Sequence, residues 1–125
     1  GGASRHALVE ADRQADGVII STPGYHGSIS GLIKNALDGL EDLRGDVRPY
    51  LEDRAVGCIV IADGWQAGGS TLAALRAIVH ALRGWPTPFG ALLNGAAREP
   101  QDQDRLALVA QQVVSFANSR IAARD

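Results

Sequence analysis

Two short glycine-rich stretches hold the residue types best suited to binding a ligand in this chain of 125 residues. The first, STPGYHGSISG over residues 21–31, combines hydroxyl groups, a tyrosine and a histidine with three glycines. The second, DGWQAGG over residues 63–69, adds a tryptophan. Such segments offer many accessible backbone N–H and C=O groups and few bulky side chains. They suit a slot for a planar heteroaromatic ring that exchanges hydrogen bonds along its edge.

The hydrophobic pattern predicts the elements around these stretches. Continuous apolar runs predict buried strands at residues 17–21, 55–62 and 89–93, and both faces of the first strand are expected to be covered. Apolar residues at helical spacing predict helices at about residues 3–12, 29–43 and 102–120, and a further helix that ends before Gly84. Ser28 is the expected cap of the helix at 29–43, and Ser70 or Thr71 caps the further helix.

This order predicts an α/β fold, a doubly wound parallel sheet with helices on both faces, in a single domain. Ligands of such sheets bind outside the carboxyl ends of the strands. The segments 22–28, 63–69 and 94–101 each leave a strand at that edge. Because consecutive strands are usually neighbours, the two glycine-rich loops are expected to face each other about 5 to 10 Å apart.

A flavin ring fits such a slot, and Tyr25 and Trp65 each offer an aromatic ring for stacking on it. Five glycines would let the backbone come close to the ring: Gly24, Gly27, Gly64, Gly68 and Gly69. Other interpretations stay open. Glycines punctuate any doubly wound sheet as plain turns, His26 either contacts a ligand or faces water, and Trp65 either gates the site or packs at a subunit contact.

The stretch TPGYHGSISGLIKNALDGL, residues 22–40, resembles the TPEYNGSIPGxLKNALDxL signature of the NADPH-dependent FMN reductase family. These are flavodoxin-like proteins that include azoreductases and quinone or chromate reductases. The resemblance implies a flavodoxin-like fold, FMN as cofactor and NADPH or NADH as hydride donor. This chain departs from the signature at Gly24, His26 and Ser30, where the family usually has Glu, Asn and Pro.

By the same resemblance, the first segment would wrap the flavin ring and the second would line the nicotinamide side. The cofactor-binding residues so implied are Thr22, Pro23, Gly24, Tyr25, His26, Gly27, Ser28, Gly64, Trp65, Gln66, Gly68 and Gly69. Hydride would pass from NAD(P)H to FMN, and electrons then to a small acceptor such as a quinone, an azo compound or free flavin. No side-chain nucleophile and no metal site are expected, because the cofactor carries the chemistry.

Family members begin with a strand and a loop of the type GSxRxxSxN that holds the FMN phosphate, and no such segment occurs in this sequence. We therefore expect the domain to lack its N-terminal part. The apolar edge and faces of residues 17–21 would then be exposed.

Composition excludes some partners. With 12 basic and 14 acidic residues, a net charge of −2 and no basic cluster, the chain is not expected to bind nucleic acid or an anionic membrane. No stretch approaches the ~20 apolar residues of a spanning helix, so a cytoplasmic location is expected. Cys58, the single cysteine, is interpreted as a small core residue. The family resemblance implies a homodimer or homotetramer, with the helix at 29–43 as a contact surface.

Two hypotheses compete with the reductase. The chain could be a flavodoxin-like electron carrier that never binds NAD(P)H, although such carriers are usually strongly acidic. It could also be a flavin-free binding or assembly module of the same fold.

Overall fold

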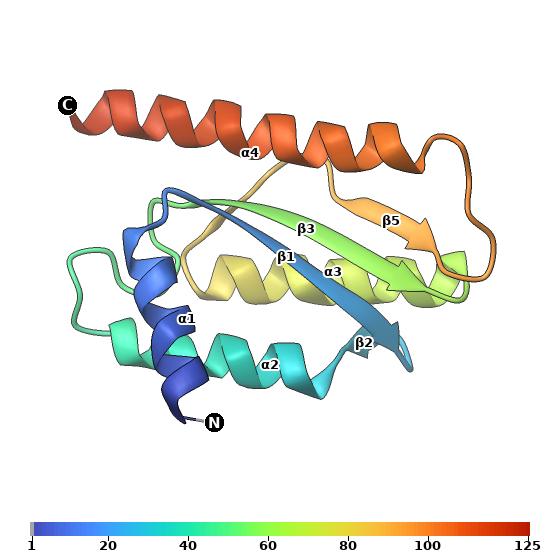
Figure 1. Cartoon of the computed structure of the whole chain (residues 1–125), viewed down its shortest axis with the longest axis horizontal. Helices are drawn as coiled ribbons and strands as arrows, with labels where there is room; N and C mark the ends of the chain where they lie inside the picture. Colours follow the sequence, from blue (N-terminus) through green and yellow to red (C-terminus); the bar gives the residue numbers. More distant parts are fainter. Residues whose placement is uncertain (1) are drawn as a thin grey trace.

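The structure is a computed structural model that describes residues 2–125, with side chains described from Ser4 onward. It has three layers: α4 lies on one side of a sheet, and α1, α2 and α3 lie on the other (Figure 1). The elements, in chain order, are α1 (Gly2–Gln14), β1 (Gly17–Tyr25), β2 (Ser28–Ile29), α2 (Gly31–Asp38), the 3₁₀-helix η1 (Gly39–Leu43), β3 (Ala55–Ala62), α3 (Trp65–Ala81), β4 (Trp85–Pro86), β5 (Ala91–Asn94) and α4 (Asp102–Arg124).

The sheet is mostly parallel, as the apolar runs predict. β3 is the central strand and pairs in parallel with β1, β4 and β5. The short β2 is the exception, because it runs antiparallel to the end of β1. The predicted α/β class with helices on both faces is confirmed, and the strand at 55–62 has the predicted bounds.

The segment 22–28 is a β-hairpin, not the loop that the sequence suggests. β1 continues four residues past its predicted end, and Gly24 and Tyr25 pair with Ile29 and Ser28 of β2. The two turn residues, His26 and Gly27, have φ angles of 52° and 78°. Positive φ at both central residues is what the type I′ turn requires, one of the two favoured turns of two-residue hairpins. Glycine adopts it freely, and histidine is one of the residue types that tolerate it.

Both helices that follow the glycine-rich segments begin at other residues than predicted. α2 begins at Gly31, and Ser30 caps it by accepting a hydrogen bond of 3.2 Å from the Ile33 N–H. Ser28 cannot cap this helix because it is paired in β2. α3 begins at Trp65, so neither Ser70 nor Thr71 is its cap, and residues 65–69 form its first turns.

The expectation that both faces of the first strand are covered is wrong. Ile20 and Thr22 are buried, but Ile19 on the opposite face is 47% exposed and Ser21 is also exposed. β1 pairs with β3 along Gly17–Pro23, and over these residues no strand of the described chain pairs with its other edge. β1 is therefore the outer strand of the parallel set and is covered less completely than β3.

The amino ends of the parallel strands are fixed by a buried arginine. Arg54 is fully buried just before β3. Its guanidinium donates hydrogen bonds to five backbone carbonyl groups, those of Arg13, Ala15, Arg48, Tyr50 and Glu52, at 2.8 to 3.5 Å. These bonds tie the end of α1 and the segment before β3 to the amino ends of the strands. The carboxyl ends carry the glycine-rich segments.

Candidate functional site

The two glycine-rich segments meet at the carboxyl edge of the sheet, where the hairpin of β1 and β2 lies beside the start of α3 (Figure 1). The Oγ1 of Thr71 on α3 donates a hydrogen bond of 3.3 Å to the Ser28 carbonyl oxygen in β2. A Cβ added at Gly27 would lie 3.7 Å from the Cβ of Ser70. The two segments therefore form one continuous edge, in the neighbourhood that the topology predicts.

The hairpin presents most of its predicted site residues to solvent. Tyr25 is 59% exposed, and Pro23, His26 and Ser28 are also exposed. Thr22 is different, since it is fully buried. Its Oγ1 accepts from the Ser30 N–H at 3.3 Å and donates to the Pro23 carbonyl at 2.9 Å. The Thr22 hydroxyl thus holds the hairpin together and has no hydrogen left to donate to a ligand.

Gly24 has a steric reason for differing from the family signature. A Cβ added there would lie 2.8 Å from the Oγ1 of Thr71 and 3.2 Å from the Cβ of Ala62. Ordinary carbon contacts begin near 3.5 Å, so no larger side chain fits while Thr71 and Ala62 keep these positions. The side-chain space at this point of the hairpin is filled by Thr71 of α3 and Ala62 of β3.

The second segment is a helix terminus. Gly64 precedes α3, and no side chain of the described residues caps this helix end. The first N–H groups of an α-helix have no partner within the helix, so those of Trp65, Gln66 and Ala67 are directed toward the carboxyl edge. Gln66 and Gly69 are exposed, and a Cβ added at Gly69 would meet no heavy atom within 4 Å.

Gly68 is the predicted site residue that the structure places least favourably for a ligand. It is buried, and a Cβ added there would lie 2.2 Å from the Cδ1 of Leu92 on β5. Its N–H donates to the Gly64 carbonyl at 3.0 Å. The expectation of an open loop at 63–69 is therefore wrong at this residue, whose lack of a side chain lets α3 pack closely on the sheet.

Trp65 lies at the start of α3 and is 45% exposed. The guanidinium carbon of Arg105, on α4, is 6.0 Å from the centre of its ring, within the range of a cation–π contact. Arg105 is in turn held by Glu99 at 3.0 Å and Asp102 at 2.9 Å. The indole is thus fixed against the start of α4 while nearly half of its surface stays accessible.

Cys58 does not contribute chemistry to this edge. It lies fully buried in β3, and burial raises the pKa of its thiol to about 11. The thiol is therefore protonated at neutral pH, which agrees with its interpretation as a core residue.

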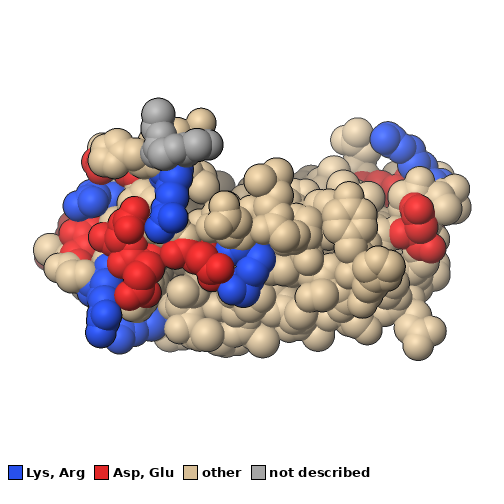
Figure 2. Space-filling model, turned by 90° about the horizontal axis from the view of Figure 1, so that it is seen from below, with Lys and Arg blue, Asp and Glu red and all other residues tan. Residues whose placement is uncertain are grey.

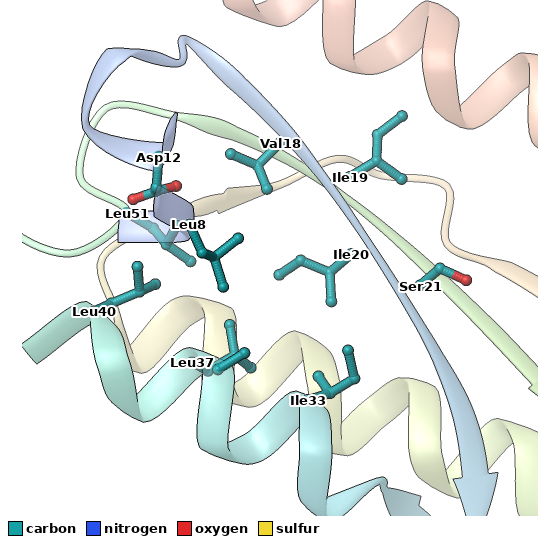
Figure 3. Close-up of a pocket in the computed structure, with 11 residues that line it drawn as sticks. Leu8, Asp12, Val18, Ile19, Ile20, Ser21, Ile33, Leu37, Leu40 and Leu51 are labelled. Carbon is teal, nitrogen blue, oxygen red and sulfur yellow. The ribbon is translucent and has the colours of Figure 1, made fainter. Parts of the chain in front are cut away.

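An apolar groove of about 250 Å³ lies elsewhere, between β1, α1 and α2 (Figure 3). Leu8, Ile20, Ile33 and Leu37 line it, together with the buried carboxyl group of Asp12. The groove follows the exposed edge of β1. The hairpin turn and the start of α3 do not contribute to its walls.

Most charged side chains on the face shown in Figure 2 gather at one end, with acidic and basic groups intermixed, and a smaller group lies at the other end. The middle of that face carries few of them. Lys34 and Asp38 pair on α2 at 2.7 Å, and Glu41 and Arg44 pair beyond it at 3.5 Å. Leu32, near the start of α2, is 80% exposed. Within residues 2–125, no helix combines the length and the apolar character needed to cross a bilayer.

Comparison with solved structures establishes the class of protein, a flavodoxin-like α/β fold. A flavodoxin, WrbA-like protein from Agrobacterium tumefaciens superposes with a TM-score of 0.75 at 17% identity, over 89% of this chain and 71% of that one. An NADPH-quinone reductase from P. pentosaceus superposes with a TM-score of 0.65 at 20% identity, over 87% of this chain and 73% of that one.

The sequence establishes the family. The model of the NADPH-dependent FMN reductase family matches residues 2–99, and the chain belongs to this family. An FMN-dependent NADPH-azoreductase of Staphylococcus aureus is 34% identical over 123 residues, which cover 90% of this chain. The match covers 62% of the azoreductase, so the chain spans less than two thirds of that relative's length.

The sequence predicts that the two segments meet, but it does not identify the residue that joins them. Its pattern marks Thr71 only as a helix cap, whereas the Thr71 side chain bridges α3 and the hairpin. A threonine inside an apolar helical stripe gives no local signal of a partner 43 residues away. Only the packing of α3 against β2 shows the contact.

Proposed function

We propose that this chain carries the cofactor-binding edge of an NAD(P)H-dependent FMN reductase. The enzyme would pass hydride from NADPH or NADH to FMN, and electrons on to a small acceptor such as a quinone, an azo compound or free flavin. Family membership and the 34% identity to an FMN-dependent NADPH-azoreductase support this proposal. The observation that carries it is the juxtaposition of the exposed hairpin 22–28 with the uncapped start of α3.

The residues present fit a flavin ring. The hairpin exposes Tyr25 and His26, and the first N–H groups of α3 face the same edge. In this proposal the backbone of Pro23–Ser28 holds the edge of the ring and Tyr25 packs against it. Backbone donors in such a place stabilise negative charge that develops on a bound ring. When bound, FMN supplies the acceptor for hydride and the means of passing on electrons.

The second segment would bind the nicotinamide side. Gly64, Trp65, Gln66 and Gly69 line it, and Trp65 is held in place by Arg105. The protein would act by orienting two rings in contact and by excluding water between them, which is how binding groups lower the barrier of a bimolecular transfer. Gly68 serves the packing of α3 on Leu92 in this arrangement.

We also propose that the FMN phosphate is held by a segment outside residues 1–125. More than a third of the azoreductase lies outside its match with this chain, and the edge of β1 beside the hairpin is open. A strand added to this edge would end close to the hairpin, because parallel strands share their carboxyl edge. Residues 1–125 alone would then bind FMN weakly.

The proposed assembly is a homodimer or homotetramer in the cytoplasm, with α2 as a contact surface. The exposed Leu32 and the sparsely charged middle of the face in Figure 2 support this contact. The proposed partner in the reaction is a small-molecule electron acceptor, and neither nucleic acid nor a membrane is required.

The test is anaerobic stopped-flow mixing of the FMN-loaded chain with NADPH. A reductase bleaches the flavin absorbance within seconds. If the absorbance persists although FMN is bound, the chain is an electron carrier and the reductase is refuted. If FMN fluorescence is not quenched up to millimolar flavin, the flavin-free module is favoured instead.

A matched pair of tryptophans locates the reaction on the molecule. Trp65 and Trp85 are 45% and 49% exposed, and Trp85 pairs with the amino end of β3, at the opposite edge of the sheet. An aromatic contact is worth about 0.5–1.5 kcal/mol, so Trp65→Leu is expected to slow flavin reduction about two- to tenfold. Trp85→Leu should leave the rate unchanged. Equal effects of the two substitutions would contradict the proposed site.

A further inference from the structure

We infer that Thr71 is a positioning residue whose hydroxyl clamps the hairpin to α3 and thereby sets the separation between the two cofactor-binding segments. This inference rests on the proposed function for its consequence, but the clamp itself is a property of the flavin-free chain. Thr71 has no assigned role among the binding residues, and it is fully buried, so it acts through the segments that it joins and touches no ligand.

The hydroxyl of Thr71 has two acceptors. Its Oγ1 lies 2.9 Å from the carbonyl oxygen of Ala67, one turn earlier in α3, and 3.3 Å from that of Ser28 in β2. A hydroxyl has one hydrogen, which it shares between these carbonyl groups. Ala67 belongs to the first turn of α3 and Ser28 closes the hairpin. One buried side chain thus links the N-terminal turn of the helix to the strand that faces it.

The hairpin is shaped to receive this side chain. Gly24 pairs with Ile29 across the hairpin, and a Cβ at Gly24 would lie 2.8 Å from the Thr71 Oγ1. The backbone of β1 therefore approaches the hydroxyl closely because residue 24 is glycine. Thr71 fills the space that a larger side chain at position 24 would take. The two residues form a complementary pair that fixes how near α3 comes to β1.

The neighbouring hydrogen bonds make the clamp rigid. The Thr22 Oγ1 accepts from the Ser30 N–H at 3.3 Å, so the strand after the turn is tied back to β1 within the hairpin. Thr71 then ties the hairpin as a unit to α3. Without the hydroxyl, the hairpin would move relative to the helix as one body, and the slot between the segments would vary in width. A binding site that must be ordered again on each encounter binds its ligand more weakly.

The test compares Thr71→Val, which keeps the shape and removes the hydroxyl, with Thr71→Ser, which keeps the hydroxyl. The matched control is Thr87→Val, because Thr87 is also buried and its Oγ1 has no hydrogen-bond partner among the described residues. Amide hydrogen exchange of the flavin-free proteins is measured first. A neutral hydrogen bond is worth about 0.5–1.5 kcal/mol, so T71V should speed exchange at residues 28–30 about two- to tenfold. Exchange at the core of β3 should not change.

Titration of FMN, followed by its fluorescence, is the second measurement. T71V should raise the Kd for FMN about two- to tenfold, while T71S and T87V stay within about twofold of the unchanged protein. Should T71V not fold, Thr71→Ala is compared with T71S instead, because neither variant has the threonine methyl group and only T71S keeps the hydroxyl.

Several outcomes overturn the inference. If folded T71V exchanges residues 28–30 at the unchanged rate, there is no clamp. If T71S loosens the hairpin and T71V does not, the methyl group and not the hydroxyl holds the segments. If the hairpin loosens in T71V but the Kd for FMN stays the same, the clamp does not position the site. If the unchanged protein binds no FMN, the proposed function fails, and the exchange data still decide whether the clamp exists.

Discussion

Replacing Gly68 with alanine adds one methyl group where α3 lies against β5. The added Cβ would lie 2.2 Å from the Cδ1 of Leu92, 3.2 Å from its Cγ and 3.3 Å from its Cδ2. Carbon atoms attract one another at about 3.5–4.0 Å, so Leu92 must retreat by more than about 1 Å or α3 must move off the sheet. Leu92 packs against the core cluster that contains Val60 and Leu75, which limits the room for its retreat.

Two effects of opposite sign decide the magnitude. Overpacking of a core usually costs about 1–3 kcal/mol, whereas alanine is favoured over glycine inside a helix by about 1 kcal/mol. We therefore expect Gly68→Ala to lower the free energy of unfolding by up to about 2 kcal/mol. Gly69→Ala is the matched control one residue later. No heavy atom lies within 4 Å of its added Cβ, so it should raise the free energy of unfolding by about 0.5–1 kcal/mol.

Urea unfolding of the two variants gives the comparison directly, because the shift of the midpoint at constant slope reports the change in stability. Since both substitutions are glycine to alanine in the same helix, their helix propensities cancel in the difference. That difference should be about 1–3 kcal/mol in favour of the Gly69 variant. The double variant Gly68→Ala/Leu92→Ala should lose less stability than the two single variants lose together, because the Leu92 atoms that clash with the added methyl group are gone. Equal stability of the Gly68 and Gly69 variants would refute the close packing of α3 on β5.

Three further substitutions test the polar interior. Arg54→Met should lower the free energy of unfolding by about 3 kcal/mol or more, because five carbonyl groups lose a buried charged donor; an unchanged urea midpoint would contradict this. Burial raises the pKa of Asp12 above its ordinary 3.8 despite the attraction of Arg54, so its ionisation opposes folding. Asp12→Asn should therefore be more stable than the unchanged protein at neutral pH, and this advantage should vanish below about pH 3.8. For Asp53, burial acts to raise the pKa, but hydrogen bonds from Arg120 and Arg124 lower it below 3.8. Asp53→Asn should therefore lower the free energy of unfolding at neutral pH, and this loss should disappear as the pH falls below 3.8. For Asp12 or Asp53, a stability difference that does not change with pH would contradict the assigned pKa shift.

The parallel sheet was predictable because its signal is local. The runs at 17–21 and 55–62 are apolar without alternation, and each leads into a helical pattern. Because ligands of such sheets bind at the carboxyl ends of the strands, the sequence also predicts that the hairpin and the start of α3 lie at one edge. The resemblance at residues 22–40 predicts the NADPH-dependent FMN reductase family, and the match of the family model to residues 2–99 confirms this prediction.

The errors arose where contacts between distant residues decide local structure. Glycines in the sequence favour a loop, yet Gly68 lies inside α3, where Leu92, 24 positions later, leaves no room for a side chain. The extension of β1 to Tyr25 depends on its pairing with Ser28 of β2, and the Thr71 hydroxyl in turn holds β2 through the Ser28 carbonyl group. Neither propensity nor periodicity contains this information. The apolar run alone predicts that Ile19 is covered, because such a run shows that burial is possible but not whether a neighbour covers it. The expectation that the domain lacks its N-terminal part predicts instead the exposure that Ile19 has.

The central claim is that the hairpin and the start of α3 together hold a flavin ring. Titration of FMN into the ¹⁵N-labelled chain, followed by the backbone amide signals, tests it most directly. The largest shifts are expected at residues 24–29 and 65–69, with few changes along the groove lined by Leu8, Ile20 and Ile33. Shifts confined to that groove, or the absence of any shift at millimolar FMN, would contradict it.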